Sequence, residues 1–186
     1  MLAYIPLPFP LFVQPLRIAV TGVPGSGKTS FCSQFNYQTI SVLELAIQNN
    51  AVVQETLNSE VIEIDIEQLN KKLSKLWQNP PNDILLVDGH LSHNLPVDCI
   101  VLLRCRPDVL EHRLKERNWS EEKVSENVEF EFLSAIINEL NENILTLELD
   151  NTKNTFLELK EHFLNWFNSE KNTHMLNIDW IKELHS

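Results

Sequence analysis

Residues 22–29, Gly-Val-Pro-Gly-Ser-Gly-Lys-Thr, constrain the fold of this chain more than any other feature of its sequence. They match the pattern G-x-x-x-x-G-K-[ST], and three of the four glycines in the chain lie within them. A short apolar run, 16–21, precedes them, and residues 28–35 read as a helix. Such a loop wraps a phosphate chain with its backbone N–H groups, because glycine permits positive φ angles and the helix N-terminus adds partial positive charge. The sequence therefore predicts a phosphate-binding P-loop between a buried strand and a helix.

Two side chains of the P-loop and one aspartate after it are the expected ligands of ATP and Mg²⁺. Lys28 is expected to reach the β- and γ-phosphates of ATP, and the Thr29 hydroxyl is expected to ligate Mg²⁺. Asp88 directly follows the apolar run 84–87, as a Walker B aspartate does. At the carboxyl end of a neighbouring parallel strand it would face the bound magnesium.

Two histidines come soon after this aspartate. His90 is placed to position or deprotonate an attacking group near the γ-phosphate, which makes it a candidate catalytic residue. His93 has no comparable argument, and we expect it to be structural or solvent-exposed.

Apolar runs alternate with helical patterns along the rest of the chain, which favours a parallel sheet covered on both faces. We predict one α/β domain, a three-layer P-loop fold with a parallel sheet of about five strands. Asp65 is the expected N-cap of a helix, Pro107 and Ser120 open two more, and the apolar positions after Ser120 recur to Leu140. The expected strands after the first are 39–42, 84–87, 99–103 and 144–149, and the expected helices are 42–50, 65–77, 107–117, 120–140, 152–167 and 178–184.

Composition limits the class of protein. The 186 residues are 43% hydrophobic and carry a net charge of −11, which argues against a protein that grips the nucleic-acid backbone, so no DNA binding is expected. The three cysteines are Cys32, Cys99 and Cys105, an odd number without a Cys-x-x-Cys pair. We expect buried thiols in a reducing compartment, the cytoplasm or, in a eukaryote, also the nucleus, and no zinc site.

Residues 1–15 are apolar but contain four of the nine prolines. They lack the basic start and the uninterrupted apolar run of a signal peptide, and prolines at this density prevent a continuous helix. We expect an extended or disordered leader without a role in the chemistry, and no segment that spans a membrane.

The segment 113–123 is a candidate phosphate clamp. Arg113 and Arg117 lie four residues apart on one predicted helix face, with Lys115 and Lys123 nearby. Glutamates interleave with them, so a solvated helix with i,i+4 ion pairs fits the same residues. The spacing alone does not decide between these two interpretations.

Together these motifs resemble one family, the small adenylate kinase-like ATPases that include the coilin-interacting nuclear ATPase and its archaeal relatives. The resemblance depends on the P-loop, on Asp-Gly-His-Leu-Ser-His at 88–93, on the run 102–110 and on the segment 113–127. It extends over residues 16–167.

The resemblance implies an adenylate kinase fold with a core domain of 16–168, an NMP-binding segment at about 40–65, a short lid at about 116–126 and a tail of 169–186. It implies ATP-dependent phosphorylation of AMP, some ATP hydrolysis and a part in maturation of the small ribosomal subunit. The nucleotide-binding set it indicates, with Ser26 of the same loop added, is Gly25, Ser26, Gly27, Lys28, Thr29, Ser30 and Arg117. The catalytic candidates are Lys28, Asp88 and His90, and the metal ligands are Thr29 and Asp88.

Two positions depart from the family pattern. Relatives carry a basic residue after a Leu-Ala pair in the NMP-binding segment, whereas Ile47 follows Leu45-Ala46 here. An AMP phosphate would therefore lose a cationic partner. Relatives also carry glycine where Asn118 follows Arg117, and asparagine tolerates the left-handed conformation.

Three hypotheses about function remain open from the sequence. The first is an adenylate kinase that forms ADP from ATP and AMP. The second is a switch ATPase that binds a basic ribosomal protein and has little AMP kinase activity. The third is a small-molecule kinase of the same fold with another acceptor.

Overall fold

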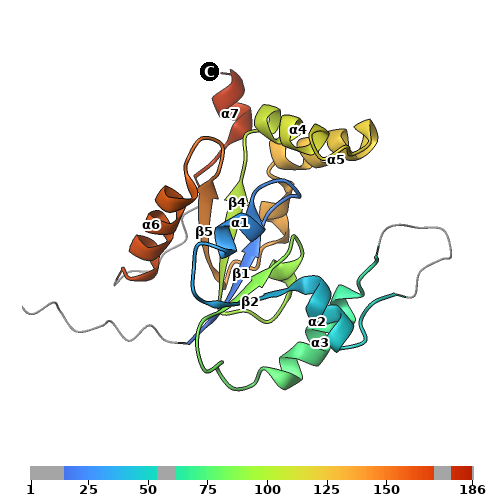
Figure 1. Cartoon of the computed structure of the whole chain (residues 1–186), viewed down its shortest axis with the longest axis vertical. Helices are drawn as coiled ribbons and strands as arrows, with labels where there is room; N and C mark the ends of the chain where they lie inside the picture. The colour runs from blue at the N-terminus through green and yellow to red at the C-terminus, as the bar shows by residue number, and fades with distance from the viewer. Residues whose placement is uncertain (1–14, 54–61, 170–176, 186) are drawn as a thin grey trace, which may run out of the picture.

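The structure, a computed structural model, describes residues 15–53, 62–169 and 177–185. Five parallel strands form one sheet in the order β2-β3-β1-β4-β5, with helices on both faces (Figure 1). This confirms the predicted α/β fold with a parallel sheet of five strands. The strands are β1 (Arg17–Thr21), β2 (Gln38–Ser41), β3 (Leu85–Asp88), β4 (Cys99–Arg104) and β5 (Leu145–Asp150).

The helices cover the two faces because successive residues of the central strand point to opposite sides. Ile18 of β1 packs in one cluster with Phe31 of α1 and Phe163 of α6. Ala19, the next residue, packs in a second cluster with Leu69 of α3. The helices are α1 (Lys28–Cys32), α2 (Val42–Gln48), α3 (Ile66–Leu76), α4 (Pro107–Lys115), α5 (Glu121–Phe132), α6 (Phe156–Phe167) and α7 (Trp180–His185), with 3₁₀ turns η1 (Ser92–Asn94) and η2 (Ala135–Glu139).

A smaller apolar cluster joins the loop after β1 to the pair α4 and α5. Val23 of that loop packs there with Leu110, Leu114 and Val124, all of them buried. The position of these two helices is therefore linked directly to the P-loop.

Three predicted helix starts are confirmed. The Asp65 side chain accepts a hydrogen bond from the backbone N–H of Gln68 at 2.8 Å, as expected of the N-cap of α3. Pro107 is the first residue of α4, and Ser120 is the N-cap of α5.

The predicted helix 120–140 is wrong in its second half. α5 ends at Phe132, and Ser134 adopts a left-handed conformation with φ 51° before η2 begins. The Ser134 hydroxyl accepts a hydrogen bond from Arg104 at 2.8 Å, so a contact from the end of β4 fixes this break.

The helix predicted from residue 152 begins later, at Phe156. Thr155 and Glu158 form a capping box, in which each side chain accepts from the other residue's backbone N–H. Thr152 is held outside the helix because its hydroxyl accepts from the backbone N–H of Arg106 at 2.9 Å.

The three cysteines are free and buried, as predicted. In the part of the chain that the structure describes, every helix is too short or too polar to cross a bilayer. Residues 1–14 of the predicted leader lie outside the described residues, as do 54–61 of the NMP-binding segment and 170–176 of the tail.

Candidate active site

The P-loop leaves the carboxyl end of β1, the middle strand, in a backbone conformation that requires glycine. Gly22, Gly25 and Gly27 have φ angles of 134°, 87° and 98°. A β-carbon on Gly22 would clash with the carbonyl oxygen of Leu103, and one on Gly27 would clash with the side-chain amide of Asn151. The predicted phosphate loop is therefore formed by positive φ angles and close backbone packing.

Lys28, the first residue of α1, folds back over the loop. Its ammonium donates hydrogen bonds to the carbonyl oxygens of Gly22 at 2.9 Å and Val23 at 3.0 Å. Burial lowers the pKa of Lys28 to about 8, Asp88 opposes this shift, and the positive charge of Arg117 adds to it. The amine therefore lies between the charges of Asp88 and Arg117, two of the predicted site residues.

Thr29 and Asp88 meet although 59 residues separate them in the sequence. The Thr29 hydroxyl donates to Asp88 Oδ2 at 2.6 Å. They meet because β1 and β3 are neighbours in register, with Val20 opposite Asp88, and both strands end at the same edge of the sheet.

The donor set at this edge fits a nucleotide with Mg²⁺. A hydroxyl and a carboxylate are oxygen ligands of the kind that Mg²⁺ prefers, completed by phosphate oxygens. Among the described residues no three His, Cys, Asp or Glu side chains gather as a metal site. The Ser26 hydroxyl is buried within the loop and has no hydrogen-bond partner in the described part of the chain, so the loop also holds an unused polar atom.

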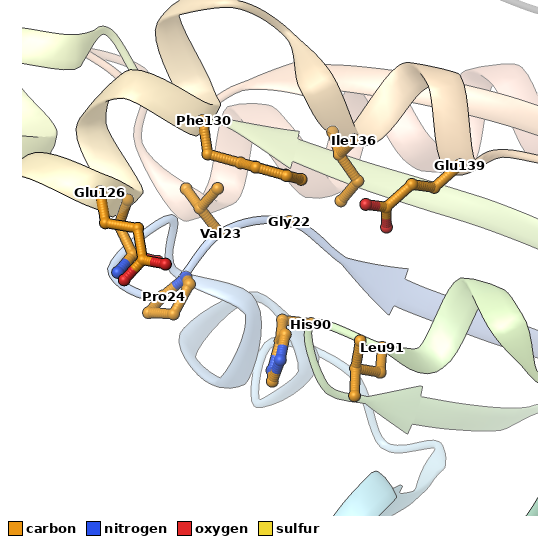
Figure 2. Close-up of a pocket in the computed structure, with 10 residues that line it drawn as sticks. Gly22, Val23, Pro24, His90, Leu91, Glu126, Phe130, Ile136 and Glu139 are labelled. Atoms are coloured by element: carbon orange, nitrogen blue, oxygen red, sulfur yellow. The ribbon is translucent and has the colours of Figure 1, made fainter. Parts of the chain in front are cut away.

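His90 lies at a pocket of about 310 Å³ that opens beside the P-loop. In Figure 2, Glu126, Phe130, Ile136 and Glu139 line one side of it, and His90 and Leu91 lie on the other. Desolvation at the edge of the pocket and the nearby positive charge of Lys28 lower the pKa of His90, which favours the neutral imidazole. The full lining is Gly22, Val23, Pro24, His90, Leu91, Glu126, Asn127, Phe130, Ile136 and Glu139.

His93 has a structural role, which is one of the two alternatives expected for it; the other was exposure to solvent. It is buried, and its ring nitrogens lie 2.9 Å from the Thr21 hydroxyl and 3.2 Å from Glu139. The same Thr21 hydroxyl donates to the His90 carbonyl oxygen at 2.9 Å. His93 and Thr21 thus hold the backbone that carries His90.

Arg113 supports the P-loop from behind and is not free to clamp a phosphate. It donates to the carbonyl oxygen of Asn151 at 2.8 Å, and the Asn151 amide donates to the carbonyl oxygen of Ser26 at 2.7 Å. Asn151 is not among the site residues predicted from the sequence. Its place directly after the last strand, at the edge where ligands bind in such sheets, was the available signal.

Of the other basic residues in this segment, one fits a solvated helix and one stays available to bind phosphate. Lys115 pairs with Glu111 one turn away at 2.5 Å, as in a solvated helix. Arg117 is exposed after the end of α4 and makes no ion pair within the described residues, yet its charge acts on Lys28. Asn118 has φ 57°, the left-handed conformation that glycine supplies in the family pattern.

Ile47 is 59% exposed on α2 and presents an apolar side chain where the family pattern has a cation. The described part of the predicted NMP-binding segment consists of β2, α2 and a single antiparallel bridge between Val52 and Ile64.

The sequence matches the model of a known family, described as "AAA domain", over residues 18–134. The chain belongs to this family. That match includes the P-loop, Asp88, His90 and α5, the helix that lines one side of the pocket.

Similar full-length proteins come from archaea. A Thermococcus onnurineus protein named "Putative adenylate kinase" is 34% identical, and the match covers 89% of this chain and 92% of that protein. An Archaeoglobus fulgidus protein of the same name is 35% identical over 91% of this chain and 94% of its own length. The similarity to these relatives indicates that this chain belongs to an adenylate kinase-like family of P-loop proteins.

Solved structures agree on the fold. TT1252 from Thermus thermophilus superposes with a TM-score of 0.51 at 14% identity, over 82% of this chain and 98% of its own. An uncharacterized protein from Eubacterium ventriosum gives 0.52 at 13% identity, over 84% and 100%.

Proposed function

We propose that this protein is an ATP-dependent phosphotransferase of the adenylate kinase type, which converts ATP and AMP into two ADP. The observation that carries the proposal is the meeting of Lys28, Thr29 and Asp88 at one sheet edge, beside the pocket at His90. The relatives named as adenylate kinases support the choice of reaction.

Each residue has a role that follows from its chemistry. The P-loop N–H groups and Lys28 hold the β- and γ-phosphates, and Thr29 and Asp88 would hold Mg²⁺. The metal, when bound, neutralises charge on the phosphate oxygens. Arg117, exposed and unpaired within the described residues, is placed to move toward the same charge from the lid.

In the transfer itself, an oxygen of the AMP phosphate forms a bond to the γ-phosphorus. The bond between that phosphorus and the bridging oxygen of ADP breaks, and the bridging oxygen keeps the electron pair. Neutral His90 at the pocket orients the attacking group or accepts its proton.

The test measures ATP turnover side by side with and without AMP. ADP formation that rises with AMP supports the kinase reaction, whereas ATP binding with no AMP-dependent turnover contradicts it. Ile47→Arg sharpens the test, because it restores a cation at an exposed position on α2. It should lower the KM for AMP about tenfold, a value that corresponds to one charge-assisted hydrogen bond.

A second function, a switch ATPase that binds a basic protein partner, is favoured by a specific observation. Among the residues that the structure describes, the pocket is lined by Glu126 and Glu139 but by no lysine or arginine, and the chain carries a net charge of −11. In this function water replaces AMP as the acceptor. The resemblance described above makes a small-subunit ribosomal protein the first partner to test, by pull-down with and without ATP, and a partner whose binding ignores nucleotide would contradict the switch.

A further inference from the structure

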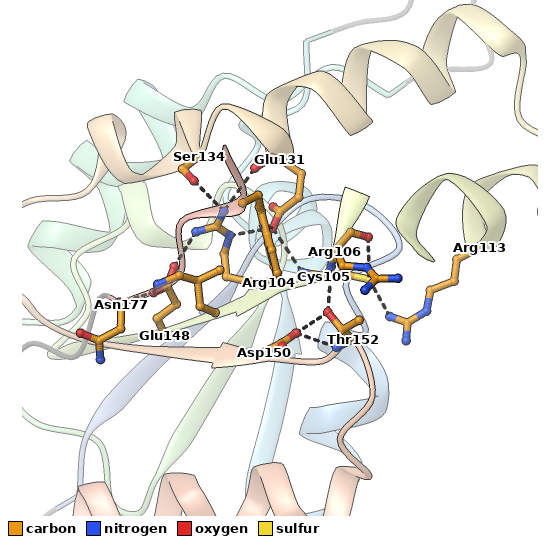
Figure 3. A network of polar contacts seen from close by, with 12 residues as sticks. Arg104, Cys105, Arg106, Arg113, Glu131, Ser134, Glu148, Asp150, Thr152 and Asn177 are labelled. Atoms are coloured by element: carbon orange, nitrogen blue, oxygen red, sulfur yellow. Dashed lines mark hydrogen bonds and ion pairs between the residues drawn. The ribbon is translucent and has the colours of Figure 1, made fainter. Parts of the chain in front are cut away.

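A buried ionic network connects the C-terminal helix to the wall of the pocket. Arg104, at the end of β4, donates through Nε to Glu131 at 2.7 Å and through Nη1 to Glu148 at 2.5 Å. All three side chains are almost completely buried. Figure 3 shows Arg104 between Glu131 and Glu148, with Ser134 and Asn177 beside them.

The carboxyl groups of this network depend on hydrogen bonds from the C-terminal segment, residues 177–185. Two carboxylates face one guanidinium, and burial raises the pKa of Glu131 even though Arg104 lies against it. The backbone N–H groups of Asn177 and Ile178 donate to Glu148 Oε2 at 2.6 and 2.8 Å. The C-terminal segment thus supplies hydrogen-bond donors that replace water at these buried carboxyl groups.

Trp180 makes the second link between that segment and the network. Its indole N–H donates to Glu131 Oε1 at 2.8 Å, and its ring, 1% exposed, lies 5.7 Å from the Arg104 guanidinium. The same Glu131 oxygen also accepts from the Cys105 backbone N–H at 3.2 Å.

Glu131 matters to the site because α5 has few other buried residues. Val124 and Glu131 are the two that are buried on this helix. Glu126, Asn127 and Phe130 of the same helix form a wall of the pocket, and Phe130 directly precedes Glu131. Any movement of Glu131 therefore moves that wall relative to Pro24 and His90.

We propose that Glu131 is a positioning residue, through which the C-terminal segment holds α5 against the acceptor side of the active site. This inference rests on the proposed phosphotransferase function. It assigns residues 177–185 a part in turnover, although they lie outside the AAA-domain match.

The test is Trp180→Phe, which keeps an aromatic ring in place and removes the N–H donor to Glu131. We expect kcat for ADP formation from ATP and AMP to fall about fivefold to tenfold, because a buried hydrogen bond that holds the Glu131 carboxyl group is lost. The Kd for ATP should stay within about twofold, since Lys28 is held by the Gly22 and Val23 carbonyl oxygens and the loop by Asn151, contacts in which Trp180 takes no part. Trp77→Phe is the matched control, because this half-buried tryptophan lies over Arg17 at the opposite end of β1.

A double-mutant cycle distinguishes this role from a general loss of stability. Glu131→Gln should lower kcat, and adding Trp180→Phe to it should lower kcat little further, because both changes act through one contact. Glu129→Gln, exposed on the same helix, should leave kcat unchanged. All variants are assayed well below their melting temperatures.

Each outcome gives a decision. Unchanged kcat in Trp180→Phe overturns the inference, as does an equal loss of ATP affinity, or independent effects in the cycle. A wild-type protein that binds ATP but turns over nothing overturns the proposed function instead.

Discussion

At the scale of single residues, Lys28 carries the most testable chemistry. Its buried ammonium must be protonated to attract phosphate, and burial lowers its pKa to about 8. Protonated Lys28 predominates below that value and is lost above it, so ATP affinity should fall as the pH rises from 7 to 9. Isothermal titration at a series of pH values measures this change.

The matched control for Lys28 is Lys28→Arg, whose guanidinium stays charged over this range. Its ATP affinity, although lower at pH 7, should not depend on pH between 7 and 9. Equal pH dependence in the two proteins would contradict the assignment of the titration to Lys28.

Predicted and observed site residues agree where a short stretch of sequence determines the local structure by itself. The P-loop was predictable because glycine spacing alone dictates its backbone, and Asp88 because it ends an apolar strand. Asn151 gave only a positional signal, its place directly after the last strand, and Glu131 gave none, because each acts through a contact with a segment far away in the chain. Glu131 lies near the end of a helix rich in glutamate, and the local sequence gives no sign that it will be buried.

At the scale of elements, α3 illustrates how a cap supports the site. Asp65 caps this helix, and the Asn70 amide, one turn further on, donates to the carbonyl oxygen of Asn94 in η1, close to His90. Asp65→Ala should therefore lower the free energy of unfolding by about 1 kcal/mol. Urea denaturation followed by circular dichroism measures this.

Glu67→Ala is the control for that change. Glu67 lies in the same first turn, is exposed and makes no capping hydrogen bond. It should cost less than about 0.5 kcal/mol. A loss equal to that of Asp65→Ala would mean that charge near the helix N-terminus, and not the cap, stabilises α3.

The ends of α5 show why element boundaries were only partly predictable. Its start followed from Ser120, a local signal, whereas apolar spacing continued to Leu140 without a proline or glycine to stop it. The helix ends at Phe132 because Arg104 binds both the Glu131 carbonyl oxygen and the Ser134 hydroxyl. Those contacts depend on the completed sheet.

At the scale of the whole molecule, the strand order places the candidate site. β1 lies between β3 and β4, so the P-loop, Asp88 and the Arg104 network all lie at the carboxyl ends of three adjacent strands. The C-terminal part of the chain also contacts this edge of the sheet. Asn151, after the last strand, donates to the P-loop, and the segment that carries α7 donates to Glu148 and, through Trp180, to Glu131. A ligand bound at this edge would lie where segments from across the sequence meet, and its binding should therefore stabilise the fold.

Thermal unfolding tests this expectation and the role of magnesium together. At a concentration 100 times Kd, MgATP should add about 2.7 kcal/mol to the free energy of unfolding, which raises the Tm by about 5–10 °C for a chain of this size. With EDTA in place of magnesium the rise should shrink, because Thr29 and Asp88 then have no cation to hold against the phosphates. Asp88→Asn should show the smaller rise under both conditions, since the neutral amide is a weaker ligand for Mg²⁺ than the carboxylate. An equal rise with and without magnesium in the wild-type protein would leave Thr29 and Asp88 as a structural hydrogen bond between α1 and β3, and would remove them from the metal site.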